Sequence, residues 1–64
     1  MRVRLPDGSL RTVEADGIPV EEVLARLGVN PVEVIVTRNG SPVSEDAIAG
    51  KDDEIRLIRI SHGG

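Results

Sequence analysis

One amphipathic helix, flanked only by strand-like segments, limits what this 64-residue chain can fold into. Its apolar residues recur at helical spacing: Val20, Val23, Leu24 and Leu27. Pro19 suits the first helical position and Gly28 suits the end, so the pattern predicts a helix over residues 19–27. A single short helix needs one face of a sheet to cover its apolar stripe. The chain is therefore expected to combine this helix with a sheet.

The segments on both sides of the helix are typical of hairpins. Residues 2–5 alternate polar and apolar side chains, and residues 10–15 follow them after a Pro-Asp-Gly-Ser turn. Residues 34–38 are rich in β-branched side chains and lead into Asn39-Gly40, the strongest two-residue hairpin signal. The sequence predicts one hairpin before the helix and a second after it.

The C-terminal part of the chain completes the predicted sheet. A short return strand is expected at Pro42-Val43, at a sheet edge because proline cannot donate a ladder hydrogen bond. Residues 47–49 are expected to form a brief helical turn, and residues 54–60 the last strand. The compact arrangement of these elements is an α+β, β-grasp fold. It has a mixed four- to five-stranded sheet packed on one helix, with the first and last strands at the centre.

Composition is consistent with one small domain. The chain has no Cys, Phe, Tyr or Trp, so its core has to be built from Val, Ile, Leu and Ala. We expect the domain over residues 1–60 and a flexible Gly-Gly tail over residues 61–64. A net charge of −3 disfavours direct binding to nucleic acid. No apolar run is long enough for a bilayer, and the start does not resemble a signal peptide, so a cytoplasmic monomer is expected.

Gly63 and Gly64 end the chain directly after the last predicted strand. Glycine has no Cβ, so this segment is thin and accepts backbone angles that other residues avoid. A thin tail with a free carboxylate can enter the narrow active site of another protein. The alternative is an ordinary frayed end without a function.

Two stretches carry a resemblance to a known family. Asp52-Asp53-Glu54-Ile55 is followed by alternating aliphatic residues and then by Gly63-Gly64. Asn30-Pro31-Val32-Glu33-Val34 is followed by Asn39-Gly40 and a Pro-Val-Ser-Glu-Asp segment at residues 42–46. With the predicted order of elements, these features resemble the ubiquitin-like β-grasp family. Within it, the chain is similar to the sulfur carriers ThiS and MoaD, the ubiquitin-related modifier and the small archaeal modifier proteins.

This resemblance implies that Gly64 is the reactive residue and that the chain is not itself an enzyme. A ubiquitin-activating-type enzyme would adenylate the Gly64 carboxylate with ATP, and a sulfur donor would convert it to a thiocarboxylate. A sulfur acceptor enzyme would then receive the sulfur, with tRNA thiolation as the first choice. Lysines of target proteins could instead take the carbonyl as an isopeptide. The chain would need no cofactor of its own, since the ATP belongs to the partner enzyme.

The sequence is also compatible with other functions. A ThiS-like carrier would supply sulfur for the thiazole of thiamine, and a MoaD-like carrier would supply it for molybdopterin. A hypothesis from a different class is a β-grasp protein-binding module whose Gly-Gly end is incidental. Enzymatic activity is disfavoured because the chain offers no paired general acid and base in a plausible pocket.

Strand alternation predicts a partner-docking patch, defined as Ile35, Arg56, Ile58 and Ile60. If Ile55 and Leu57 face the core, these four residues fall on the opposite face of the sheet when the strands are neighbours. Exposed apolar patches on small proteins often mark partner sites. The alternative is that a few exposed isoleucines are normal on any protein surface.

The remaining polar candidates are weaker. Lys51 is the chain's one lysine and a possible acceptor for modification by a second copy. His62 has no companions at ligand spacing, and Asp52-Asp53-Glu54 lacks the spaced ligands of a calcium loop, so no metal site is expected. An exposed tail residue and a solvated turn explain these two features.

Overall fold

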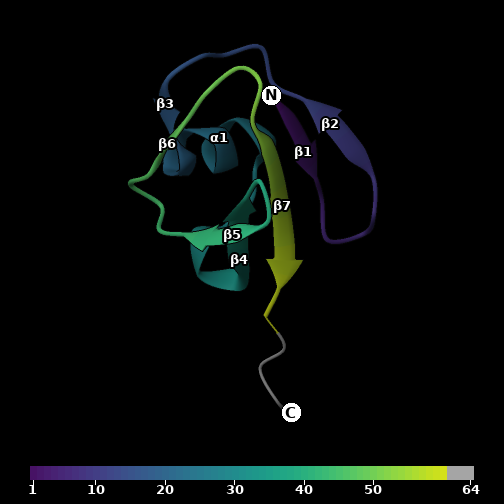
Figure 1. The fold of residues 1–64 in the computed structure, drawn as a ribbon. Coiled ribbons are helices and arrows are strands. Elements are labelled where there is room, and N and C mark those ends of the chain that lie inside the picture. Colours follow the sequence, from purple (N-terminus) through teal and green to yellow (C-terminus); the bar gives the residue numbers. More distant parts are fainter. Residues whose placement is uncertain (61–64) are drawn as a thin grey trace.

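The computed structural model describes residues 1–60, which form a five-stranded sheet, a two-stranded ribbon and one α-helix (Figure 1). The larger sheet has the order β2-β1-β7-β4-β5. Its strands are β1 (Arg2–Arg4), β2 (Leu10–Thr12), β4 (Val34–Arg38), β5 (Ser41–Val43) and β7 (Glu54–Arg59). The ribbon pairs β3 (Ile18–Pro19) with β6 (Ile48–Ala49), and α1 spans Val20–Leu27. The predicted tail, residues 61–64, lies outside the described residues.

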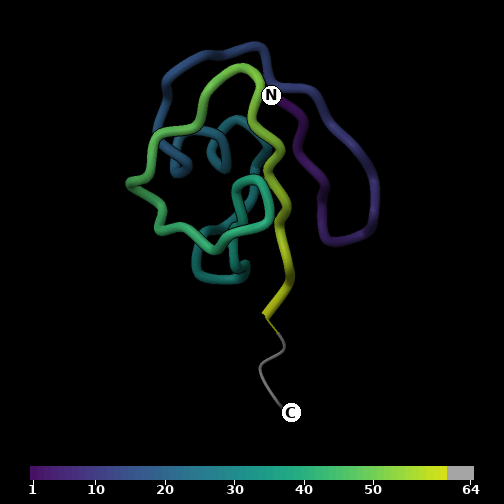
Figure 2. Tube along the Cα trace, in the orientation of Figure 1, coloured from purple at the N-terminus to yellow at the C-terminus, as the bar shows by residue number. Residues whose placement is uncertain are grey.

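Strand β7 lies at the centre of the sheet and joins its two halves. It runs parallel to β1 and antiparallel to β4, and the other pairs in this sheet are antiparallel, so the sheet is mixed. Figure 2 shows β7 running through the molecule beside the N-terminal strand, with the first hairpin on one side. One helix on a mixed sheet confirms the predicted β-grasp architecture. Pro42 lies in the edge strand β5, where a residue without an N–H is tolerated.

Aliphatic side chains from the helix and the sheet form the core. From α1 come Val20, Val23 and Leu24, and from the sheet Val3, Ile55 and Leu57; all six are fully buried. Gly28 ends the helix with φ of 71°, in the left-handed region that glycine adopts without strain. Its N–H and that of Val29 bond to carbonyls of the last helical turn. In the last strand the buried residues are Ile55 and Leu57, as its alternation predicts.

The helix begins one residue later than predicted. Pro19 is at the N-cap with extended backbone, because it pairs with Ile48 in the ribbon. The first helical N–H groups, of Val20 and Glu21, donate to the carbonyls of Ala47 and Glu45 at 2.8 Å. A chain segment thus caps this helix, in place of a side chain.

The prediction of a helical turn at residues 47–49 is wrong. These residues contain β6, which pairs antiparallel with β3 through Ile18 and Ala49. A straight crossing over the start of α1 puts the carbonyl of Ala47 where the helix needs an acceptor. In a helical turn these carbonyls would accept hydrogen bonds from their own segment, and the first N–H groups of α1 would lose their acceptors.

The ends of three strands also differ from prediction. The first strand ends at Arg4, and the second ends at Thr12 rather than at residue 15. Val13 is nevertheless buried and donates from its N–H to the Met1 carbonyl at 2.9 Å. The last strand ends at Arg59, and the N–H of Ile60 then donates to the carbonyl of Glu33 at 2.9 Å. These contacts continue the chain path beyond the regular ladder.

Candidate docking face and tail

The sheet has one face covered by α1 and a second face, the outer face, which no element of residues 1–60 covers. Ile35 of β4 and Ile58 of β7 are direct cross-strand partners on the outer face. Their exposed fractions are 47% and 43%, whereas their neighbours Val36 and Leu57 are buried. The structure therefore places the two central members of the predicted docking patch side by side at the surface.

The other two members of the docking patch differ from each other. Arg56 is exposed on the outer face, opposite Thr37 of β4. Ile60 lies just beyond β7 and is half-buried, so it contributes less surface than predicted. Its backbone is fixed by the hydrogen bond to Glu33. That bond directs the chain out of β7 beside the turn that precedes β4.

Sequence reasoning missed Val32, which is 71% exposed. Val32 lies in a 3₁₀ turn, Pro31–Glu33, that precedes β4. The Asn30 side chain caps this turn by accepting a hydrogen bond from the N–H of Val32 at 3.1 Å. The Asn-Pro pair was the available signal, since Asn favours a cap and Pro the first position of the turn. Val32 adds apolar surface where the chain leaves β7.

Arginines give the outer face a basic character. In the parallel pair, Arg4 lies opposite Arg56 and Arg2 lies opposite Glu54. Arg2 and Glu54 form an exposed ion pair with N···O 3.7 Å. Within residues 1–60 neither Arg4 nor Arg56 pairs with a carboxylate, although Arg4 donates to the Gly8 carbonyl at 2.9 Å. Like charges placed opposite each other destabilise a strand pair, so the placement of Arg4 opposite Arg56 does not stabilise the fold.

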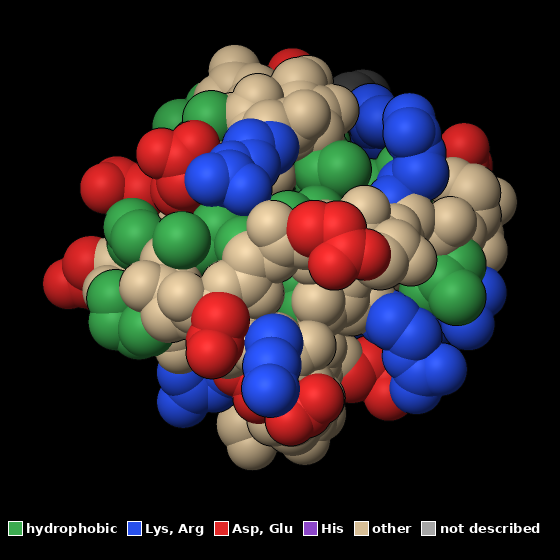
Figure 3. Space-filling model, turned by 90° about the horizontal axis from the view of Figure 1, so that it is seen from above, with side chains coloured by type: hydrophobic (Ala, Val, Ile, Leu, Met, Phe, Trp, Pro, Cys, Tyr) green, Lys and Arg blue, Asp and Glu red, His purple; other side chains and the backbone are tan. Residues whose placement is uncertain are grey.

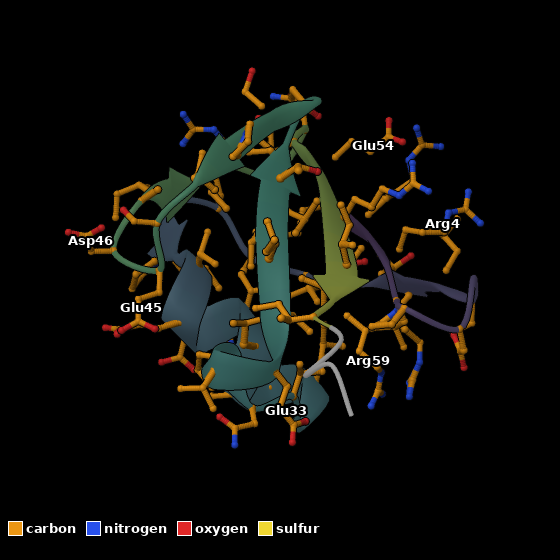
Figure 4. The ribbon with its side chains drawn as sticks, turned by 90° about the horizontal axis from the view of Figure 1, so that it is seen from below. Arg4, Glu33, Glu45, Asp46, Glu54 and Arg59 are labelled. Atoms are coloured by element: carbon orange, nitrogen blue, oxygen red, sulfur yellow. The ribbon has the colours of Figure 1, made fainter. Side chains whose placement is uncertain are left out.

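The two sides of the molecule differ in charge. Figure 4 shows Arg4, Arg59 and Glu54, the partner of Arg2, on the side of β1 and β7, and Glu45 and Asp46 on the far side, beyond β5. Glu21 and Glu22, in the first turn of α1, add to the acidic residues away from the outer face. A chain of net charge −3 thus presents a basic surface beside an apolar one.

Lys51 lies far from the end of β7. The loop between β6 and β7 is at the pole that holds the N-terminus, and β7 ends at the opposite pole (Figure 1). Figure 3 looks at the first pole and shows acidic and basic side chains interspersed with small apolar areas. Lys51 is exposed, and its backbone N–H donates to the Asp16 carboxylate at 3.1 Å. The hollow beside it is lined by residues that include Glu14, Asp16 and Asp52.

Asp53 organises the turn at the start of β7. Its carboxylate accepts hydrogen bonds from the Gly50 N–H at 2.7 Å and from the Asn39 amide at 2.9 Å. These two bonds, the one from Gly50 first, hold the pKa of Asp53 below its usual value. Within residues 1–60 no cluster of three or more His, Cys, Asp or Glu side chains could hold a metal ion. The hydrogen bonds of Asp53 stabilise the turn that leads into β7.

Residues 2–61 match the model of the family described as small archaeal modifier protein 2. The chain belongs to this family. A relative described as an uncharacterized protein, from Archaeoglobus fulgidus, is 36% identical over 52 residues, which cover 81% of this chain and 76% of the relative. The chain is therefore a small ubiquitin-like modifier of the archaeal type, and the resemblance inferred from its motifs is confirmed.

Membership of this family also supports the general class of partner. Small modifier proteins act with activating enzymes and with targets, and they are modifiers rather than catalysts. Over residues 1–60 no helix is long and apolar enough to cross a membrane. His62, Gly63 and Gly64 lie outside the described residues.

Proposed function

We propose that this modifier is activated at Gly64 and serves as a sulfur carrier, with tRNA thiolation as the first use, and as a conjugate to target lysines. The carrying observation is the family match together with a Gly63-Gly64 end only a few residues beyond the central strand β7. β7 is held by β1 on one side and β4 on the other. Such a strand is a rigid base from which a thin tail can reach into an active site.

The proposed chemistry takes place at the Gly64 carboxylate. A terminal carboxyl has a reference pKa of about 3.3–3.7, so it is ionised at neutral pH. Its oxygen attacks the α-phosphorus of ATP in the partner enzyme, forming an acyl-adenylate and releasing pyrophosphate. Hydrosulfide released by the sulfur donor then attacks the acyl carbon and loses its proton, while the bond from that carbon to the phosphate oxygen breaks and AMP leaves, which gives a thiocarboxylate. A lysine amine at the same carbon gives an isopeptide instead.

The outer face supplies the proposed docking surface for the activating enzyme. Ile35 and Ile58 form its apolar centre, and Arg4 and Arg56 lie on the neighbouring positions of β1 and β7. An apolar centre with charged surroundings is the usual anatomy of a protein interface. The complementary partner surface would be apolar with carboxylates placed beside the apolar centre. Such complementarity raises the association rate and fixes the docking register.

The decisive experiment follows the mass of the intact chain. The protein is incubated with ATP, a sulfur source and its cognate activating enzyme. The proposal predicts a mass gain equal to the exchange of one oxygen atom for sulfur. A variant with one residue added after Gly64 is the matched control, because it keeps the domain but removes the glycine carboxylate from its position. It should fold normally and show no exchange.

The alternative outcomes are informative as well. An unchanged mass with an enzyme that activates another carrier would support a β-grasp binding module. A thiocarboxylate that is consumed by a thiazole-forming or molybdopterin-forming enzyme, and not by a tRNA-thiolating one, would favour the ThiS-like or MoaD-like role. Isopeptide-linked peptides ending in Gly-Gly would identify target lysines, and they would show whether Lys51 of a second copy is among them.

A further inference from the structure

The turn between β4 and β5 contains a chemically reactive dipeptide, which the folded state holds in one conformation. Asn39 and Gly40 form the turn, both with positive φ, 51° and 89°. An Asn-Gly pair suits such a turn because Gly pays no steric cost there and Asn tolerates the left-handed region. The same pair is chemically labile, because a following glycine leaves its backbone nitrogen unshielded beside the asparagine carboxamide.

Three hydrogen bonds fix Asn39 to the start of β7. Its side-chain amide donates to the Asp53 carboxylate at 2.9 Å, and its side-chain carbonyl accepts from the Glu54 N–H at 2.9 Å. Its own N–H donates to the Glu54 carbonyl at 2.8 Å. Both ends of the carboxamide are therefore engaged, one of them with a charged partner. Ring closure onto Gly40 requires the side chain to leave both.

We propose that Asn39 is a site of covalent modification by deamidation, which the folded state blocks and which opens when the turn releases Asp53 and Glu54. In the released turn the Gly40 nitrogen attacks Cγ of Asn39. The new C–N bond forms, the Cγ–Nδ2 bond breaks, and ammonia leaves with the proton lost by the Gly40 nitrogen. Water then opens the five-membered imide at either carbonyl, giving aspartate or isoaspartate at position 39.

The product cannot rebuild the original contacts. A carboxylate at position 39 has no N–H to donate, so it meets the Asp53 carboxylate as a like charge where a hydrogen bond had been. The chain's net charge changes from −3 to −4, the value after one amide becomes one carboxylate. The modified turn is therefore released more readily than the original one.

This chain allows the modification to be read from its intact mass. Its asparagines are Asn30 and Asn39, and it contains no glutamine. Asn30 precedes Pro31, whose nitrogen carries no hydrogen and cannot form the imide. The mass change of deamidation thus reports position 39 alone. Peptide mapping would separate the aspartate and isoaspartate products.

The first test compares the folded wild-type chain with the same chain in urea, at one pH and temperature. Deamidation should be at least roughly tenfold slower in the folded state, because release breaks two side-chain hydrogen bonds, one of them to a charge. Equal rates in the two states would overturn the proposal. This comparison requires no variant and so does not depend on the folding of one.

The second test assigns the protection to Asp53. Asp53→Ala removes the acceptor of the Asn39 amide. Asp16→Ala is the matched control, since the Asp16 carboxylate also accepts a hydrogen bond from the loop that holds Asp53, from the backbone N–H of Lys51. Rates are corrected for the unfolded fraction of each variant, measured by urea titration. Asp53→Ala should deamidate several-fold faster than Asp16→Ala. Indistinguishable corrected rates would show that the Asp53 contact does not protect the site and would overturn the proposed mechanism.

Discussion

The two faces of strand β7 differ in burial, although their residues alternate along the same short segment. On the helix side Ile55 and Leu57 are fully buried. On the outer face Arg56 and Ile58 are exposed, one residue away in each case. Ile55 and Ile58 are the same amino acid, so hydrophobicity alone does not say which of them holds the fold together. Their position in the alternation does: one face holds the core, and the other is the face that we propose for docking.

The largest expected effect is on the buried face. Leu57→Ala should lower the free energy of unfolding by about 2–5 kcal/mol, because it removes a fully buried side chain and leaves a cavity. A domain of this size is marginal, so such a loss is a large share of its total stability. Urea unfolding followed by circular dichroism measures the change.

The matched variant on the outer face is Ile58→Ala. Ile58 is 43% exposed, so its truncation should cost about 1 kcal/mol or less. Losses of equal size from Leu57→Ala and Ile58→Ala would break the comparison, because both faces would then carry the fold.

The next effect is on binding to the activating enzyme. Ile58→Asp and Arg56→Glu should each raise the Kd about tenfold, equivalent to about 1.4 kcal/mol, while the unfolding midpoint stays close to that of the wild type. Isothermal titration measures the Kd. Arg11→Glu is the control, since Arg11 is exposed in β2 opposite the inward-facing Val3 and off the outer face. A similar loss from Arg11→Glu would mean that net charge, and not the outer face, governs docking.

The alternation of β7 shows which features of the fold can be predicted from the sequence. Period-two patterning predicted the buried pair Ile55 and Leu57, and helical spacing predicted the buried face of α1. Asn39-Gly40 predicted its turn because few other residues accept two successive positive φ angles. These signals are local, and each is set by residues within one element.

The features that sequence reasoning missed depend on contacts between distant segments. β6 exists because β3 and the start of α1 offer it partners. Nothing within residues 47–49 encodes those partners, so a short apolar run there was compatible with helix or strand. Ile60 is likewise half-buried at a point where its N–H bonds to the carbonyl of Glu33, in a turn far away in the sequence.

A smaller effect concerns acid stability at the start of β7. The pKa of Asp53 is lowered by its bonds from Gly50 and Asn39, so the unfolded chain binds a proton more readily than the folded one. The resulting stabilisation is present above the unfolded pKa, near 3.8, and is lost as the pH falls through the lower folded value. Asp53→Asn should therefore flatten the loss of stability in this acid range.

Urea midpoints measured from pH 2 to 6 would test the effect of Asp53. Asp52→Asn is the neighbouring control, because no hydrogen bond to its carboxylate is found within residues 1–60. An acid limb that is equally steep in wild type and Asp53→Asn would show that the turn does not depend on this charge.

The smallest effect tests the outer face through the ion pair between Arg2 and Glu54. The Arg2 and Glu54 side chains are each about two-thirds exposed, and pairs of this kind contribute roughly 0.2–1 kcal/mol. Glu54→Gln should therefore lower the unfolding free energy by about 0.5 kcal/mol or less. It also removes a carboxylate from a basic face, so association with an acidic partner should become faster at low salt, and the gain should fade at high salt. Stopped-flow association at two ionic strengths measures this change. A loss of stability comparable to that of Leu57→Ala, without a change in association rate, would mean that the outer face supports the fold after all.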